Sequence, residues 1–295
     1  MITPLQDRDV LDRAGLERLI EHLITGGVHG VFILGTTGEA PGLSYRLREE
    51  LVRLTCSQVK GRLPVLVGIT DTSFVESLRM AAVAADHGAR ALVLSAPYYF
   101  PAGQAELLEY LQHLAAELPL PTFLYNMPTH TKITFEPETV RRAMDIPRII
   151  GIKDSSASMT YFHQLIQLLP SRPEWSLLTG PEELLAESLL LGGHGGVCGG
   201  ANLWPELYVK LFAAAQQRDL PEVTRLHAQV MRLATTIYAV GQYRSSVIKG
   251  IKCGLACLGI CDDFMAEPFH RFRDAEHARI ERYMTELGIE RNRRK

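Results

Sequence analysis

The chain has 295 residues, of which 46% are hydrophobic and 22% are charged, with a formal net charge of −2. This composition is typical of a globular protein with a large core. It has no excess of positive charge that would attract nucleic acid or an anionic membrane. No apolar stretch approaches the ~20 residues that span a bilayer, and the start MITPLQDRDV lacks the pattern of a signal peptide. The odd number of cysteines, five, predicts no disulfide framework, and we expect a reducing cytoplasm.

Short strand-like runs alternate with helix-length amphipathic segments along the first two thirds of the chain. The predicted strands are residues 30–34, 63–69, 90–96, 120–125, 148–153, 175–179 and 194–199. Residues 2–4 resemble the tail of an eighth strand. Helices are predicted at 12–25 and at 45–59, where Ser44 is the expected N-cap, and Ser73, Gly103 and Pro181 begin three others. Strands this apolar favour a parallel sheet that is buried on both faces.

Eight strand–helix units over about 220 residues predict a TIM (β/α)8 barrel, with a doubly wound sheet as the alternative. After residue 203 only helical patterns follow: 203–217, 220–240, 245–259 and the last thirty residues. We therefore expect a barrel catalytic domain over residues 1–220 and a C-terminal helical extension over 221–295 that packs on the barrel.

Polar side chains stand at the ends of several predicted strands. Lys153 and Tyr125 each end a strand, and Thr36, Thr37 and Tyr99 follow two others. In a TIM barrel the C-terminal ends of the strands meet at one mouth, so we expect these side chains to converge there. Alone, each element has a simpler interpretation, because a lysine at a strand end often faces solvent and the turns can merely connect elements.

This set of side chains suits covalent chemistry on a 2-oxo acid. A lysine amine in a partly desolvated pocket loses proton affinity and becomes a nucleophile toward carbonyls. The resulting imine draws electrons from the adjacent carbon, so a C–C bond can form or break there. A phenol such as Tyr125 can carry the protons. The tight turn LGTTGEA (34–40) has backbone N–H groups and hydroxyls that suit a carboxylate.

Two other patterns have a simpler explanation. Cys253, Cys257 and Cys261 are spaced i, i+4, i+8 and would share a helix face if the helix continues that far. We interpret them as small hydrophobic residues and predict no metal site, since no nearby His or Cys pair has zinc spacing. The run GGHGGVCGG (192–200) lacks the GxGxxG spacing and the Walker lysine of phosphate loops, so we interpret it as a strand with close backbone approach.

Taken together and in this order, four motifs carry a family resemblance: GTTGEA (35–40), PYYF (97–100), YNMP (125–128) and GIKDSS (151–156). They resemble the dihydrodipicolinate synthase and N-acetylneuraminate lyase family, and the similarity runs along nearly the whole chain. The resemblance implies a class I pyruvate-dependent aldolase or related dehydratase on a TIM barrel with extra C-terminal helices. Such enzymes are usually homotetramers, built as dimers of dimers. They need no metal or organic cofactor, because the imine is the electron sink.

The resemblance also implies roles for single residues. Lys153 matches the Schiff-base lysine and Tyr125 the acid/base tyrosine. Thr36 and Thr37 match the loop that binds the pyruvate carboxylate, and Thr36 also matches the hydroxyl of the proton relay. Tyr99 matches a tyrosine that crosses a tight dimer interface to the neighbouring active site. The other expected substrate-binding residues are Gly35, His130, Ser155, Gly180, Glu182, Val197 and Cys198.

Departures from the family pattern bear on the substrate. Dihydrodipicolinate synthases carry an arginine two positions after the YNxP proline, where this chain has His130. A neutral histidine cannot offer a carboxylate the bidentate fork of arginine. The motifs KDSS and GGVC are closer to the sialic acid lyase and 4-hydroxy-2-oxoglutarate aldolase branches. A carboxylate at Glu182 would suit a sugar acid, although the segment PEEL can also simply begin a helix.

The leading hypothesis is a Schiff-base lyase that makes or cleaves a C–C bond of a 2-oxo acid, with pyruvate as one partner and an aldehyde as the other. The substrate would be a sugar acid or a 4-hydroxy-2-oxo acid. The alternatives are 4-hydroxy-tetrahydrodipicolinate synthase of lysine biosynthesis, a 2-keto-3-deoxy sugar acid dehydratase, and a keto-acid-binding sensor without activity. Lys153 and Tyr125 argue against the sensor, since binding needs no nucleophilic amine. Relatives normally have several more residues before ITP, so the first strand is expected to be short or to begin upstream.

Overall fold

The computed structural model describes residues 1–290. These residues form two compact units, one made of Met1–Leu63 together with the residues from Gly199 onward, the other made of Pro64–Cys198. Within the described range, no helix combines the length and the apolar character needed to cross a membrane.

The unit Pro64–Cys198 is built on a parallel sheet. Its strands are neighbours in chain order: β4 (Val65–Gly68), β5 (Ala91–Ser95), β6 (Thr122–Asn126), β7 (Ile149–Asp154), β8 (Ser176–Thr179) and β9 (Gly195–Gly196). All five residues of β5 are buried, as expected of strands that are covered on both faces. The strand predicted at 194–199 shortens to two glycines.

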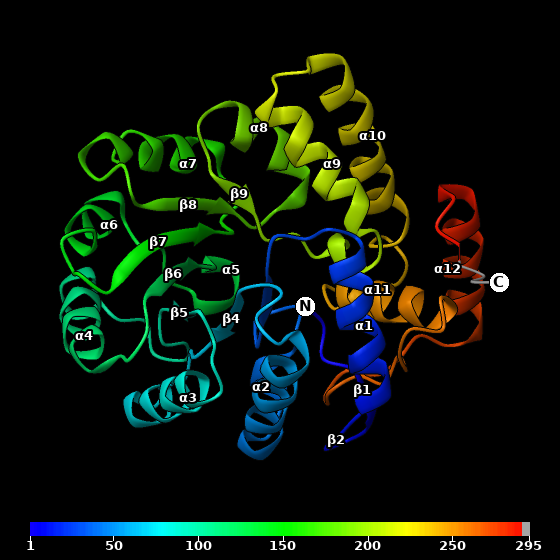
Figure 1. Ribbon diagram of the computed structural model, residues 1–295, viewed down its shortest axis with the longest axis horizontal. Coiled ribbons are helices and arrows are strands. Elements are labelled where there is room, and N and C mark those ends of the chain that lie inside the picture. The colour runs from blue at the N-terminus through cyan, green and yellow to red at the C-terminus, as the bar shows by residue number, and fades with distance from the viewer. Residues whose placement is uncertain (291–295) are drawn as a thin grey trace. The chain divides into compact units, whose positions relative to one another are not determined.

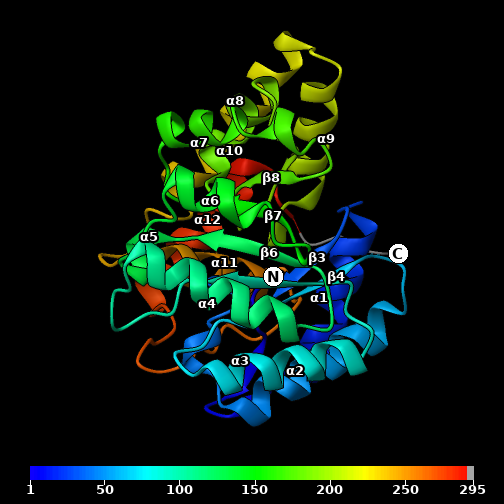
Figure 2. The same ribbon diagram turned by 90° about the vertical axis from the view of Figure 1, so that its left-hand side faces the viewer.

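Helices follow these strands and cover the outer face of the sheet, which curves as seen in Figure 1 and from the side in Figure 2. They are α3 (Phe74–Asp86), α4 (Gln104–Glu117), α5 (Pro128–Thr131), α6 (Pro137–Ala143), α7 (Met159–Ile166) and α8 (Leu185–Leu190). Local sequence explains where they begin. Gly103 caps α4 and its N–H donates to Glu106 Oε2 at 2.7 Å, and the Ser158 side chain accepts from Tyr161 N at the start of α7.

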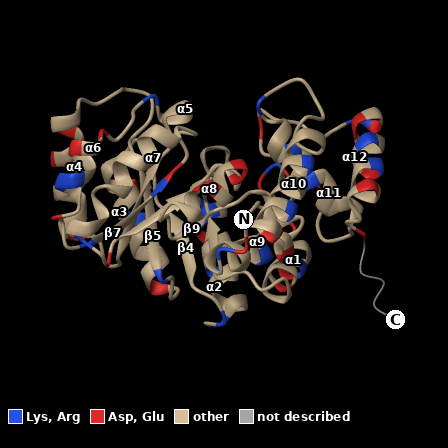
Figure 3. Cartoon of the chain, turned by 90° about the horizontal axis from the view of Figure 1, so that it is seen from above, with Lys and Arg blue, Asp and Glu red and all other residues tan. Residues whose placement is uncertain are grey.

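Among the residues that the structure describes, the other unit consists of a small antiparallel hairpin, one further strand, six α-helices and two short 3-10 helices, Ala40–Gly42 and Gly200–Asn202. The strands and α-helices are β1 (Leu5–Asp7), β2 (Val10–Leu11), α1 (Arg13–Thr25), β3 (Val31–Ile33), α2 (Tyr45–Val59), α9 (Pro205–Gln216), α10 (Leu220–Thr236), α11 (Ser246–Cys257) and α12 (Asp274–Leu287). Ser44 caps α2 as predicted, its side chain accepting from Leu47 N. Helix α12 packs against α10 and α11, and both signs of charge alternate along it (Figure 3).

Several predicted elements differ from those observed. Residues 2–4 form no assigned strand; they are buried, and Ile2 N donates to Asn202 Oδ1 at 2.9 Å. Helix α11 ends at Cys257, and Gly259 has a φ of +70°, so the predicted helix over 245–259 is too long. Cys261 lies beyond the end of the helix and therefore does not share a helix face with Cys253 and Cys257. Of the last thirty residues, Asp274–Leu287 are helical, residues 266–273 are not, and 291–295 lie outside the described range.

Candidate active site

Lys153 and Tyr125 lie side by side on neighbouring strands. Tyr125 of β6 is in register with Lys153 of β7, so their side chains share one face of the sheet. Lys153 Nζ lies 4.1 Å from the centre of the Tyr125 ring. Both residues are buried, with 8% of Lys153 and 7% of Tyr125 exposed. The structure thus holds an amine and a phenol together where the strands end, as the sequence predicted for this pair.

The next residue on each strand points to the opposite face and locks the pair in place. Asn126 Nδ2 donates to Asp154 Oδ1 at 2.8 Å, and Asn126 Oδ1 accepts from Phe135 N at 3.1 Å. Ser156 donates to Asp154 through its N–H at 3.0 Å and its hydroxyl at 2.9 Å. Burial raises the pKa of Asp154, and these hydrogen bonds oppose that rise. Sequence reasoning missed this network, although Asn126 and Asp154 directly follow Tyr125 and Lys153.

Gly180 leaves the space that Lys153 needs. It follows β8, and its N–H donates to Asp154 O at 2.7 Å. A Cβ at this position would lie 1.8 Å from Ser155 Oγ and 3.2 Å from Lys153 Cε. Ser155 N in turn donates to Asn126 O at 2.8 Å. The ends of β6, β7 and β8 are therefore tied together around the lysine, and a side chain at position 180 would force Ser155 to shift.

Glu182 and Cys198 belong to the same group of side chains. Glu182 is buried in a short 3-10 helix, Glu182–Leu184, so PEEL begins this turn before α8. Burial is the main cause that raises the pKa of the Cys198 thiol; the charge of Glu182 adds to it and that of Lys153 opposes it. Glu182 and Lys153 thus each lie close enough to Cys198 for their charges to act on its thiol. Val197 N donates to Thr179 O at 2.8 Å at the end of β8.

Tyr99, on a loop, and His130, on the short helix α5, are both exposed residues of the same unit. Tyr99 is 84% exposed with a φ of +97°, and its ring packs edge-on against Phe100, also 80% exposed, with centroids 5.0 Å apart. A positive φ at a bulky residue is a strained conformation. His130 lies on α5, is exposed, and its Nδ1 lies 3.0 Å from Thr129 Oγ1.

Gly35, Thr36 and Thr37 belong to the other unit, in a compact turn that follows β3. Glu39 N donates to Thr36 O at 3.0 Å and closes the turn. A Cβ at Gly35 would lie 2.7 Å from the Phe32 ring, so a side chain here would force that ring to shift. The three residues are partly exposed, as a binding loop needs.

A buried ion pair anchors this turn to α11. The Glu39 carboxylate pairs with Lys252, and both side chains are almost fully buried. Glu39 Oε2 also accepts from Ala266 N at 2.9 Å, and Lys252 Nζ donates to Phe264 O at 2.6 Å. Sequence reasoning missed this pair. The only signal was the presence of a glutamate in GTTGEA and a lysine in an apolar helix.

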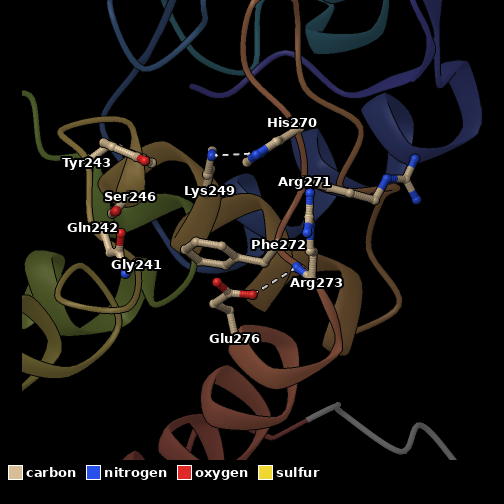
Figure 4. A pocket seen from close by; sticks show the side chains of 10 residues that line it. All are labelled: Gly241, Gln242, Tyr243, Ser246, Lys249, His270, Arg271, Phe272, Arg273 and Glu276. Carbon is tan, nitrogen blue, oxygen red and sulfur yellow. Dashed lines mark hydrogen bonds between the residues drawn. The ribbon is translucent and has the colours of Figure 1, made fainter.

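A separate cavity of about 180 Å³ lies within the same unit as this turn (Figure 4). Its lining residues are Gly241, Gln242, Tyr243, Ser246, Lys249, His270, Arg271, Phe272, Arg273 and Glu276. Lys249 Nζ lies 3.0 Å from His270 Nδ1, and Arg273 N donates to Glu276 Oε2 at 3.1 Å. None of the predicted site residues lines this cavity.

Comparison with known proteins identifies the family. The sequence model of the dihydrodipicolinate synthetase family matches residues 1–287. The chain is 32% identical over 282 residues to the probable 2-dehydro-3-deoxy-D-pentonate aldolase YjhH of Escherichia coli K12, covering 95% of this chain and 92% of the relative. It is 29% identical to the 4-hydroxy-tetrahydrodipicolinate synthase of Pseudomonas syringae pv. syringae, covering 98% and 97%.

Solved structures similar to this chain belong to the same family. A dihydrodipicolinate synthase from Bacteroides thetaiotaomicron superimposes with a TM-score of 0.95 at 56% identity, covering 97% of this chain and 96% of that one. YagE, an E. coli K12 prophage protein of the dihydrodipicolinic acid synthase family in complex with pyruvate, gives 0.92 at 27% identity, covering 98% and 96%.

These likenesses confirm the predicted fold class, a TIM barrel with additional C-terminal helices, over the doubly wound alternative. They also confirm that the protein is an enzyme, since the relatives are named as aldolases and synthases. The chain belongs to the dihydrodipicolinate synthetase family and is a Schiff-base lyase that makes or cleaves a C–C bond of a 2-oxo acid with pyruvate as one partner.

Proposed function

We propose that Lys153 forms the Schiff base and that Tyr125 carries protons to and from it. The observation that carries this proposal is their pairing at the ends of β6 and β7, with Nζ 4.1 Å from the centre of the phenol ring and both residues buried. Imine chemistry needs an amine that reaches a carbonyl and a proton donor within reach of the same atoms.

In the proposed reaction Lys153 Nζ attacks C2 of pyruvate, and the carbinolamine loses one water molecule to give an iminium ion. Loss of a C3 proton forms an enamine, with the iminium nitrogen accepting the electron pair. The enamine C3 then attacks the carbonyl carbon of an aldehyde, and water releases the product and the free amine. Cleavage runs through the same steps in reverse. Tyr125 would give its proton to the departing hydroxyl, take up the C3 proton as a phenolate, and pass that proton to the aldehyde oxygen.

Gly35, Thr36 and Thr37 are proposed to bind the carboxylate of the 2-oxo acid, with Thr36 supplying the hydroxyl of the proton relay. The compact, partly exposed turn after β3 supports this role, because backbone N–H groups and hydroxyls in such turns bind anions. The anchoring of the turn through Glu39 and Lys252 also supports it, since a binding loop must be held in one geometry.

The aldehyde partner is proposed to be polyhydroxylated, so that the joined molecule is a 2-keto-3-deoxy sugar acid. Glu182 supports this choice, because a buried carboxylate whose charge, like that of Lys153, acts on Cys198 can accept hydrogen bonds from hydroxyls. His130, at the position of the arginine expected in a synthase, supports it as well. The 32% identical relative is named a probable pentonate aldolase. The other proposed substrate contacts are Ser155, Gly180, Val197 and Cys198.

Trapping tests the assignment of the lysine. We expect pyruvate and borohydride to leave a reduced pyruvyl adduct on the peptide that contains Lys153, detected by intact and peptide mass. Lys153→Arg should abolish the adduct, while Lys249→Arg, a change at another buried lysine, should keep it. Tyr125→Phe should slow turnover by roughly 10²–10⁴-fold. Tyr161→Phe is its matched control, a buried tyrosine that donates to Phe135 O. An adduct on a different lysine would refute the assignment.

A second candidate is 4-hydroxy-tetrahydrodipicolinate synthase itself. The 56% identical protein from B. thetaiotaomicron is named a dihydrodipicolinate synthase, which favours this candidate. The two can be separated by comparing the release of pyruvate from 2-keto-3-deoxy-pentonate with the condensation of pyruvate and aspartate semialdehyde. The sugar acid is expected to give the larger kcat/KM, and His130→Arg is expected to move the ratio toward the semialdehyde. The opposite preference in the unaltered enzyme would favour the synthase.

We further propose a homotetramer, assembled as a dimer of dimers in a reducing cytoplasm. The exposed, strained aromatic pair of Tyr99 and Phe100 supports an interface between subunits, because large exposed apolar side chains mark contact surfaces. The five free cysteines support a reducing compartment. The division into a catalytic barrel over 1–220 and an extension over 221–295 that packs on the barrel remains part of the proposal.

A further inference from the structure

Two cysteines and one histidine meet between helices α11 and α12. Cys253 and Cys257 stand one turn apart on α11, and His277 lies in the first turn of α12, which packs against α11. The two sulfurs and the nearest imidazole nitrogen all lie within 4.8 Å of one another. Cys257 Sγ is 3.9 Å from His277 Nε2. The sequence pattern grouped Cys261 with the other two cysteines, but the end of α11 removes it and the fold brings in His277.

A carboxylate lies within ion-pair distance of the histidine. Glu281 lies one turn further along α12, and its Oε1 is 3.8 Å from His277 Nδ1. A carboxylate at one imidazole nitrogen favours the tautomer whose other nitrogen has a free lone pair. Here that other nitrogen is Nε2, which faces the sulfur of Cys257. The same arrangement of carboxylate, imidazole and ligand position accompanies most metal-bound histidines.

We propose that Cys253, Cys257 and His277 bind one thiophilic metal ion, with Zn²⁺ as the preferred ion. Zinc bonds of about 2.3 Å to sulfur and 2.0–2.1 Å to nitrogen in a tetrahedron place the donors about 3.5–3.8 Å apart. The cluster therefore needs to contract by at most about 1.3 Å, from 4.8 Å to about 3.5 Å. Two thiolates and an imidazole select zinc over magnesium or calcium, which prefer oxygen ligands.

The surroundings suit entry of the ion and leave room for a fourth ligand. The His277 side chain is 37% exposed and Cys257 is half-buried, while Cys253 is fully buried. The ion would enter from the surface and keep a water molecule in its fourth position. Binding converts two thiols to thiolates and releases two protons to solvent, with no redox change. The bound ion would hold α12 against α11, and it would take part in no step of the aldol reaction.

Cobalt titration of the full chain tests the site. The reduced protein is freed of metal by a chelator, the chelator is removed, and Co²⁺ is added as the probe, followed by Zn²⁺. We expect one ion per chain, a thiolate-to-cobalt charge-transfer band and its loss as Zn²⁺ displaces cobalt. Cys257→Ser and His277→Ala should each weaken binding by more than about 10-fold, and Glu281→Gln by about 10-fold. Cys261→Ser is the matched control and should bind like the unaltered chain.

A second measurement keeps the proposal testable if these variants fold poorly. Zn²⁺ should protect Cys253 and Cys257 of the unaltered chain from alkylation, as seen by peptide mass, while Cys198 reacts as before. The proposed site would be overturned by absence of the charge-transfer band, or by alkylation that Zn²⁺ leaves unchanged. It would also be overturned if Cys257→Ser and His277→Ala bound cobalt as tightly as the unaltered chain.

Discussion

At the scale of single residues, the site depends on the room left for the Lys153 side chain as much as on its reactive groups. Lys153 is held at a strand end by neighbours that the proposed reaction does not use as acid, base or nucleophile. Gly180 leaves room for its side chain, and Asn126 with Asp154 fixes the backbone from the opposite face. A small displacement of a reacting group can cost a large factor in rate, so these residues should matter for turnover.

Gly180→Ala should lower kcat strongly while the chain stays folded. The added Cβ would lie 1.8 Å from Ser155 Oγ and 2.9 Å from Ser155 Cβ, so Ser155 must shift toward new positions beside Lys153. The measurement is steady-state kinetics together with circular dichroism. Gly103→Ala is the control, because its Cβ would meet only Glu106 Oε2 at 3.4 Å. Equal kinetics for the two variants would contradict the steric role of Gly180.

Asp154 should make stability depend on pH. Burial raises its pKa above the ordinary 3.8, so between 3.8 and the raised value the folded chain binds more protons than the unfolded one. The free energy of unfolding contributed by this group therefore falls as pH rises through that window, by at most about 1.4 kcal/mol per pH unit. In Asp154→Asn the side chain at this position has no titrating carboxyl group, so its contribution to the free energy of unfolding does not change with pH.

Urea denaturation at a series of pH values checks this expectation. The free energy of unfolding of Asp154→Asn, relative to the unaltered chain, should rise across the window and level off above it. Asp86→Asn, at an exposed position on α3, is the control for the loss of one carboxyl group. A constant difference between Asp154→Asn and the unaltered chain at all pH values would contradict the linkage.

At the scale of elements, a buried ion pair joins the turn after β3 to α11. Removing one partner of such a pair leaves an uncompensated charge, so Glu39→Gln or Lys252→Met should each cost roughly 3–5 kcal/mol. The double variant should cost less than the sum, because it leaves no lone charge. Urea denaturation of the three variants gives the coupling energy. Glu267→Gln, which breaks an exposed pair with Arg8, is the control and should change stability little.

At the scale of the whole molecule, the exposed aromatic pair predicts assembly. Replacing Tyr99 and Phe100 by alanine should shift the protein to smaller species in sedimentation velocity, because their apolar surface would no longer be buried between subunits. Turnover should fall with the loss of assembly if Tyr99 reaches a neighbouring site. Val75→Ala, at another exposed apolar residue, should leave assembly unchanged. A monomeric unaltered enzyme with full activity would rule out the proposed interface.

Much of the architecture and of the site follows from local patterns. The apolar runs located seven of the strands, and the alternation of side chains along a strand explains why Lys153 and Tyr125 share a face. The ends of elements were harder to predict, because a helix such as α11 stops where its cap and packing allow. Residues 2–4 have the composition of a strand, yet their hydrogen bonds go partly to a side chain, Asn202.

The sequence by itself determined the alternation of strands and helices, the family, and the lysine and tyrosine at two strand ends, since these depend on short-range periodicity and motif order. Tertiary structure alone decided which distant polar groups meet: Asn126 with Asp154, Glu39 with Lys252, and the cysteines of α11 with His277. Such pairs leave no periodic signal, because their partners are set by packing. A buried polar group must find a partner once water is removed, and only the folded chain determines which one.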